Sequence, residues 1–172
     1  MQKNCPGHPR NPRLMKFVIQ IVRAKPEVAE GLTQIAHAAK RHWGYRESWI
    51  EAWRDVLTMR PEFIAGNISY CAIERDRPVG FYVLTTEDDG IHLDHLWVMP
   101  EAMGRGIGRT LFEHAVGEAQ SAGCFCLKIE ADPNAEAFYK RMGATRVGTS
   151  RSEVEGEQRE LPLLQFPIAK SS

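Results

Sequence analysis

The chain has 172 residues, 43% of them hydrophobic, and its 22 Lys and Arg residues balance its 22 Asp and Glu residues, which gives a formal net charge of zero. This size and composition suit one globular domain whose core folds without disulfides or a metal. A balanced charge provides no general attraction to nucleic acid or anionic lipid, so neither nucleic acid nor a membrane is an expected partner.

The cysteines and the apolar segments indicate a cellular compartment. No Cys-x-x-Cys pair occurs among Cys5, Cys71, Cys124 and Cys126, a spacing that suits neither a zinc knuckle nor a disulfide-rich secreted domain. The sequence also lacks an apolar stretch of roughly 18 residues for a membrane span, and its N-terminus lacks the apolar core of a signal peptide. We therefore expect a cytoplasmic protein.

The N-terminal part divides into a leader, a strand and two helices. Residues 1–13 contain three prolines and almost no apolar side chain, so they cannot repay the entropy of ordering. We expect a flexible leader over residues 1–15 and a single domain over residues 16–172. Apolar, β-branched residues 17–22 predict a strand, and Pro26 suits the first turn of a helix running to about Arg41.

A second helical pattern follows the break at Gly44. Its apolar positions, which recur at helical spacing, are Trp49, Ile50, Trp53, Val56 and Leu57. Pro61 is expected to end this helix.

From Ile68 the apolar period changes to two, which predicts an antiparallel meander of three strands. A glycine cluster then leads into a helix that Gly123 closes. The expected strands are 68–73, 79–85, 91–99, 124–130, and two near 144–150 and 161–168, with a short helix over 134–142.

The glycine cluster lies between a strand and a helix. The strand leads through Pro100 into residues 103–109, and Thr110 continues as helix. Glycines let the backbone approach a ligand, and the free amides at a helix N-terminus bind phosphate oxygens, so the expected ligand carries a pyrophosphate. A dinucleotide fingerprint would follow the first strand of a βαβ unit, and a P-loop would need Gly-Lys-Ser/Thr; the cluster has neither context.

Two segments resemble the GNAT superfamily of acetyl-CoA-dependent N-acetyltransferases. Residues 103–108 are similar to its Gln/Arg-x-x-Gly-x-Gly/Ala loop, with Met103 in the first position. Residues 131–144 are similar to its Asn-x-x-Ala-x-x-Phe-Tyr-x-x-x-Gly-Phe segment, with Asp132 at the usual Asn position and Asn134 two residues later. The resemblance implies an α/β (α+β) fold with a mixed, mostly antiparallel sheet of about six or seven strands and about four helices.

The resemblance also implies acetyl-CoA as co-substrate and a set of residues that hold it. Tyr139 would protonate the departing thiolate; its alternative role is to pack the short helix as a buried aromatic. The implied cofactor-binding residues are Leu96, Trp97, Val98, Met103, Gly104, Arg105, Gly106, Ile107, Gly108, Arg109, Asn134 and Tyr139.

The catalytic base is less defined. Strand alternation places His92 and Asp94 on the face of Leu96 and Val98, beside the implied acyl site, so either could serve as base. Glu130 is a third candidate. Alternatively, these residues are solvated surface groups, and the acceptor loses its proton through water to bulk solvent. Alternation sends His95 to the opposite face from His92 and Asp94, so chelation by all three is not expected and no metal is assigned.

In the resembled family the link between the first two helices commonly covers the acceptor pocket. Trp43 and Tyr45 flank a glycine there, so we expect them, with Glu130, to bind the acceptor, whereas Trp49 and Trp53 are expected in the core. The implied reaction moves an acetyl group from acetyl-CoA to the amine of a small molecule, peptide or protein by direct attack in a ternary complex.

Two other functions stay open at this stage. One is a non-catalytic acyl-CoA-binding or regulatory domain, which the departures at Met103 and Asp132 favour; the other is a structural or partner-binding domain without affinity for CoA. An exposed edge in the last strands is compatible with a homodimer.

Overall fold

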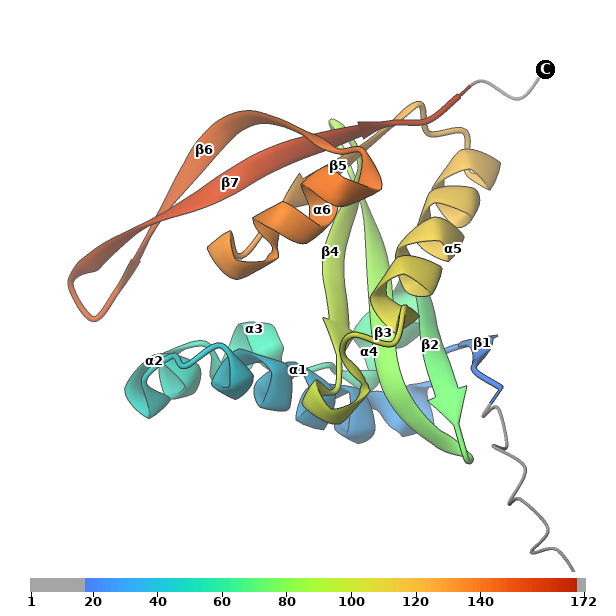
Figure 1. Ribbon diagram of the computed structural model, residues 1–172, viewed down its shortest axis with the longest axis horizontal. Coiled ribbons are helices and arrows are strands. Elements are labelled where there is room, and N and C mark those ends of the chain that lie inside the picture. Colours follow the sequence, from blue (N-terminus) through green and yellow to red (C-terminus); the bar gives the residue numbers. More distant parts are fainter. Residues whose placement is uncertain (1–17, 170–172) are drawn as a thin grey trace, which may run out of the picture.

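The computed structural model describes residues 18–169 (Figure 1). The leader expected over residues 1–15, together with Cys5 and Phe17, lies outside the described residues. A seven-stranded sheet has the order β1-β2-β3-β4-β5-β7-β6, and all neighbours are antiparallel except β4 and β5. Its strands are β1 (Gln20–Arg23), β2 (Ile68–Glu74), β3 (Arg77–Glu87), β4 (Gly90–Val98), β5 (Cys126–Glu130), β6 (Thr145–Val154) and β7 (Glu157–Pro167).

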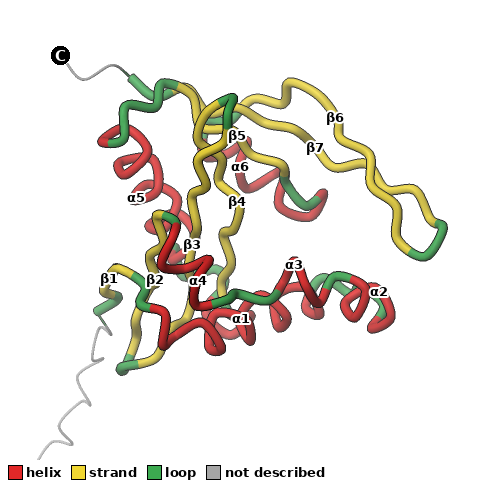
Figure 2. Tube along the Cα trace, turned by 180° about the vertical axis from the view of Figure 1, so that it is seen from behind, coloured by secondary structure: helices red, strands yellow, loops and turns green. Residues whose placement is uncertain are grey.

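Helices cover both faces of this sheet (Figures 1 and 2). Within residues 18–169, no helix is long and apolar enough to cross a membrane. The α-helices are α1 (Ala29–His42), α2 (Glu47–Ala52), α3 (Arg54–Leu57), α4 (Pro61–Gly66), α5 (Ile107–Ser121) and α6 (Glu136–Met142), with short 3₁₀ turns η1 (Pro26–Val28), η2 (Pro100–Ala102) and η3 (Pro133–Ala135).

The predicted sheet of six or seven strands is confirmed, but the number of helices was too low. The pattern expected as one helix is interrupted at Trp53 and forms α2 and α3. Pro61 does not end a helix; it begins α4, at the first-turn position. The expectation there was wrong because proline lacks an N–H, which breaks a helix interior but costs nothing in a first turn, where that group has no intrahelical acceptor.

The sheet has a hydrophobic core on each side, and β3 contributes to both. Tyr82 and Leu84 belong to the core under α5 and α6, whereas Phe81 and Val83 belong to the core under α1 and α4. Since successive strand residues point to opposite faces, a strand covered on both sides reads as a continuous apolar run. This rigid centre holds β4, the strand on which the candidate site is built.

Strands β4 and β5 separate after a single pairing. Their parallel register includes only His92 opposite Lys128, whereas β4 stays paired with β3 as far as Val98 opposite Gly80. Glycine is needed at position 80 because an added Cβ would lie 2.9 Å from the Trp97 carbonyl oxygen. The sheet therefore opens between β4 and β5, and this gap is called the splay below.

A bulge on β4 overturns one sequence-based argument. Val83 pairs with His95 and Leu84 pairs with Leu93, which leaves Asp94 as the extra residue. A bulge reverses the alternation of side chains beyond it. His92 therefore shares a face with His95, not with Leu96, and the expectation that His92 and Asp94 lie on the face of Leu96 and Val98 was wrong.

The β6–β7 hairpin, called the arm below, extends from the body of the sheet toward α2 (Figure 1). At its tip, Ser48 Oγ donates to Glu155 Oε2 at 3.0 Å, and Arg46 forms an ion pair with Glu157. The arm thus overhangs the side of the molecule on which the splay opens.

Candidate active site

One groove runs along the splay beside the glycine turn. Its volume is about 440 Å³, and it is lined by β4, the glycine turn, η3 and α6, together with Trp43 at the end of α1. Of the residues predicted to hold the cofactor, those lining it are Leu96, Trp97, Val98, Met103, Gly104, Gly106, Gly108, Arg109, Asn134 and Tyr139. We call this the cofactor groove.

The glycine turn presents backbone to this groove. Gly104 and Gly106 have φ values of +74° and +82°, and nothing lies within 4 Å of a Cβ added to either. The amides of the first turn of α5 have no intrahelical acceptor, and no side chain caps this N-terminus. The turn, with the helix dipole behind it, fits a diphosphate.

The two arginines of the turn differ in what they contact. Arg105 is turned away and forms a two-pronged ion pair with Glu74 on β2, with NH1 to Oε2 at 3.1 Å. Arg109 lines the groove, and so does Arg141 on α6, which the sequence analysis did not select. The other predicted cofactor residue, Ile107, is buried in the core. The side-chain charge available to a diphosphate therefore comes from Arg109 and Arg141.

The edge of β4 offers free amides in the splay. The Trp97 carbonyl points at β3, where it limits the space at Gly80. Because backbone groups alternate direction along a strand, the amides of Leu96 and Val98 point the other way, into the gap that β5 does not fill. They can bind a polar chain laid along β4.

Tyr139 is a buried residue in the lining of the cofactor groove. It is 5% exposed and its ring packs against Phe112 and Phe138, with centroids 5.9 and 5.2 Å away. Burial, with a smaller contribution from the charge of Asp132, raises the pKa of Tyr139 far above its usual value. Its phenol therefore stays protonated at neutral pH and is available as a proton donor.

A second cavity, of about 600 Å³, lies next to the groove on the arm side, and Trp97 lines both. We call it the acceptor cavity. Its walls come from α1, the α3–α4 segment, β4, the end of β5 and the arm. Four carboxylates line it: Asp55 and Asp132 are paired with Arg60 and Lys40, whereas Asp94 and Glu130 are not paired with a Lys or Arg within residues 18–169.

Asp94 is oriented by a buried histidine. The Trp97 indole Nε1 donates to His95 Nδ1 at 3.0 Å, and His95 Nε2 lies 3.3 Å from Asp94 Oδ2. Burial lowers the pKa of His95, although the charge of Asp94 opposes this. The neutral ring must then carry its proton on Nε2, the ring atom that faces Asp94.

A buried polar cluster forms another wall of the acceptor cavity. Lys40 Nζ lies 2.6 Å from Asp132 Oδ2, Tyr45 donates to Asp132 Oδ1 at 2.9 Å, and Arg159 NH2 donates to the Tyr45 oxygen at 3.1 Å. Asn134 Nδ2 donates to the same oxygen at 3.0 Å. Lys40 also lies over the rings of Tyr45 and Trp53, at 4.8 and 4.4 Å from their centroids.

The charges in this cluster do not balance. Burial lowers the pKa of Lys40 despite its ion pair with Asp132. For Asp132, burial is the largest single influence and raises the pKa, but the Lys40 charge and the hydrogen bonds from Lys40, Asn134 and Tyr45 together outweigh it and hold the pKa below its usual value. Burial, helped by Asp132, raises the pKa of Tyr45 to about 12. Two cations thus surround one carboxylate.

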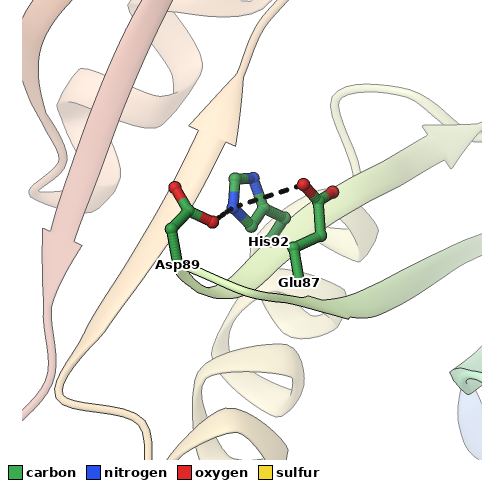
Figure 3. Close-up of side chains that lie close together, drawn as sticks. All are labelled: Glu87, Asp89 and His92. Carbon is green, nitrogen blue, oxygen red and sulfur yellow. Dashed lines mark hydrogen bonds and ion pairs between the residues drawn. The ribbon is translucent and has the colours of Figure 1, made fainter.

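His92 lies at the opposite end of β4 from these groups. Its Nε2 is 2.8 Å from Asp89 Oδ1 and 3.9 Å from Glu87 Oε2 (Figure 3). These three side chains place ligand atoms within 4.8 Å of one another, but the Lys128 ammonium already donates to Asp89. His92 lines neither the cofactor groove nor the acceptor cavity.

The aromatic residues of the α1–α2 region are distributed differently from the expectation. Trp43 lines the cofactor groove, with its ring 5.7 Å from that of Trp97, and Tyr45 is tied into the buried cluster. Trp53, expected in the core, packs against the core under α1 and α4 and also lines the acceptor cavity. Lys40 and Arg159 were missed, because a lone charge in a helix or a strand carries no signal of its partner elsewhere in the chain.

Comparison with known proteins agrees with this geometry. A model of the family described as "Acetyltransferase (GNAT) family" matches residues 29–144. Peptidyl-lysine N-acetyltransferase YjaB from Salmonella typhimurium is 37% identical over 122 residues, 71% of this chain and 74% of that protein. The Escherichia coli protein of the same name is 36% identical over 123 residues, with the same shares.

Solved structures share the fold. A GCN5-related N-acetyltransferase from Rhodopseudomonas palustris has a TM-score of 0.75 at 24% identity and covers 94% of this chain and 100% of its own. PaiA N-acetyltransferase from Thermoplasma acidophilum, in complex with coenzyme A, has a TM-score of 0.70 at 19% identity, with shares of 87% and 99%. YncA from Salmonella typhimurium, with acetyl-CoA, has a TM-score of 0.65 at 18% identity, with shares of 90% and 96%.

Proposed function

Because this chain belongs to the acetyltransferase (GNAT) family, we propose that its acceptor is the side-chain amine of a lysine in a peptide or protein. The reaction is transfer of an acetyl group from acetyl-CoA to an amine. One observation carries the choice of acceptor: a cavity in which Asp94 and Glu130 have no Lys or Arg partner among the described residues opens beside the cofactor groove at Trp97. The names of the two relatives at 36–37% identity support lysine.

In this proposal the cofactor groove holds acetyl-CoA, which supplies an activated thioester. The amides of the glycine turn and Arg109 bind its diphosphate, and the amides of Leu96 and Val98 bind the chain between the diphosphate and the thioester. Asn134 borders the same groove. Amides preset in a rigid strand stabilise a developing oxyanion without reorganising, so the strand both places and polarises the acetyl carbonyl.

Tyr139 supplies the proton that the departing thiolate needs. Its place in the lining of the groove supports this role, and its phenol is protonated at neutral pH. Asp94 and Glu130 attract the lysine ammonium, and Asp94, oriented by His95, accepts its proton so that the neutral amine can attack. His92 lines neither the cofactor groove nor the acceptor cavity, and we assign it no role in the reaction.

The test combines binding with turnover. Calorimetry should show saturable binding of acetyl-CoA, and a lysine peptide should then release free CoA, whereas the same peptide with norleucine should not. Binding without turnover on any amine would contradict the enzyme and favour an acyl-CoA-binding domain. Turnover only on small amines would contradict lysine as the acceptor.

The role of Asp94 is tested by its pH dependence. Asp94→Asn should lower kcat about 100-fold, the usual contribution of a general base, and the loss should shrink as the pH approaches the pKa of the amine. His92→Gln, on the same strand, should lower kcat by less than about twofold, as expected of a surface group. A loss in Asp94→Asn that does not change with pH would leave Asp94 as a binding group only.

A further inference from the structure

We propose that the acceptor carries a carboxylate as well as its amine, and that Arg159 and Ser152 on the arm bind this carboxylate. The two residues are called the arm subsite. This inference rests on the proposed function and narrows its substrate class. It is carried by unmet hydrogen-bonding groups and by a net positive charge at one end of the acceptor cavity.

Arg159 is buried, and most of its hydrogen-bond donors have no acceptor among the described residues. Its side chain is 10% exposed and lies over Trp53 and Tyr45, with Cζ 4.5 and 5.2 Å from the ring centroids. A guanidinium has five N–H donors, yet within residues 18–169 it forms a single hydrogen bond, to Tyr45, while Asp132 lies 3.6 Å away. The stacked rings fix the plane of the guanidinium, and the remaining donors face a cavity that Arg159 lines.

Ser152 adds a second unmet group beside it. It pairs with Arg159 across the two strands of the arm and lines the same cavity. Its Oγ is buried and has no hydrogen-bond partner among the described residues. A buried hydroxyl without a partner has lost its hydrogen bonds to water, and a ligand oxygen would restore one. A carboxylate accepts from a guanidinium and a hydroxyl together, which fits both groups.

The charge distribution points the same way. Arg159 and Lys40 outnumber Asp132, which leaves one excess positive charge at this end. Asp94 and Glu130 line the other end, and the remaining two charged residues of the lining, Asp55 and Arg60, neutralise each other as an ion pair at 3.6 Å. Glu130 pairs with Leu163, four residues along β7 from Arg159, an offset of about 13 Å along the strand. The cavity therefore has an anionic end beside the thioester position and a cationic end on the arm, and it suits an acceptor that bears both an ammonium and a carboxylate.

Two sources could supply this carboxylate: an acidic side chain near the acceptor lysine in a peptide, or the α-carboxylate of a free amino acid. Two pairs of acceptors distinguish them. One pair is a lysine peptide with glutamate or with glutamine beside the lysine. The other is Nα-acetyl-lysine and its amide.

The measurement is kcat/KM for both pairs with four proteins. Wild type should prefer the carboxylate form of at least one pair by about tenfold or more, as a charge-assisted hydrogen bond predicts. Arg159→Gln should reduce this preference to within about twofold, and Ser152→Ala should weaken it. Arg151→Gln is the matched control: Arg151 lies on the arm next to Ser152 but is exposed, and it should keep the full preference.

The outcomes separate this inference from the proposed function. Equal rates on the carboxylate and amide forms, with turnover intact, would overturn the arm subsite alone. A preference confined to free Nα-acetyl-lysine would keep the arm subsite but contradict peptides as acceptors. Calorimetry with the acetylated product of each acceptor gives the same comparison without turnover, and if Arg159→Gln does not fold, wild type and Ser152→Ala decide the result.

Discussion

The cofactor groove and the acceptor cavity meet at Trp97 but are built in different ways. Apart from Ala39 and Trp43, the groove is formed by two stretches of chain, β4 with the glycine turn and η3 with α6, and it is lined by apolar side chains and three glycines, beside which the amides of the turn and of β4 lie open. The cavity is lined by charged side chains from five regions, joined by contacts such as that of Tyr45 with Arg159. A backbone site tolerates side-chain changes, as at Met103, whereas a side-chain site depends on each partner.

The largest expected effect comes from removing the buried negative charge in the wall of the acceptor cavity. Asp132→Asn restores the residue usual at this position in the resembled family, yet it should lower the free energy of unfolding by about 3 kcal/mol, because Lys40 and Arg159 lose their buried counter-charge. Denaturant unfolding at neutral pH measures this. Equal stability of the two proteins would mean that the cluster is hydrated and that the contrast with the groove fails.

The comparison of wild type with Asp132→Asn also predicts how the free energy of unfolding depends on pH. The pKa of Asp132 is lower in the folded protein than in the unfolded chain, so its contribution is complete above about pH 4, the unfolded value, and is lost as the pH falls through the folded value. The difference in stability between wild type and Asp132→Asn should therefore shrink in acid. A constant difference would contradict the lowered pKa.

The next effect concerns chemistry within the groove. Tyr139→Phe should lower kcat about 100-fold by removing the proton donor and leave the Kd of acetyl-CoA unchanged, because the groove binds through its backbone. Tyr70→Phe, which removes a phenol bonded to Glu118 on the far side of α5, is the control and should keep full activity. Unchanged turnover in Tyr139→Phe would exclude Tyr139 as the acid.

A smaller effect tests whether backbone geometry forms the diphosphate site. Gly106→Ala should raise the Kd of CoA about 20-fold, the loss of one hydrogen bond to a charged group. Gly123, at the other end of α5, has the same φ of +82° and equally open surroundings. Gly123→Ala should introduce the same backbone strain of about 1 kcal/mol but leave the Kd of CoA unchanged. Equal weakening in both variants would assign the effect to strain alone.

The smallest expected effect distinguishes the two arginine side chains of the glycine turn. Arg109→Gln should raise the Kd of CoA about tenfold, the loss of one charge-assisted contact. Arg105→Gln should raise it by less than about twofold, because Arg105 is bound to Glu74, as expected for an exposed ion pair. The reverse ranking, measured by calorimetry, would show that the turn changes conformation when it binds CoA.

The sequence predicted much of the fold because its signals are local. The apolar period of two from Ile68 onward identified the meander, and the strand–glycine–helix order identified the groove. Single residues inside regular patterns caused the errors: Pro61 begins a helix instead of ending one, and the bulge at Asp94 changes the face on which His92 lies. Alternation counts residues and cannot detect an insertion that only the neighbouring strand reveals.

By itself, the sequence determined the strands of the meander, the family and the glycine turn, because each depends on spacing within a few residues. Only the tertiary structure decided which charges meet: Lys40 with Asp132, Arg159 with Tyr45, and Arg105 with Glu74. The physical reason is that the energy of a buried charge depends on the partners that the fold brings to it, and these partners come from distant parts of the chain. Backbone amides carry the same chemistry at every residue, so a local signal was enough to find the groove, whereas the acceptor cavity required the complete fold.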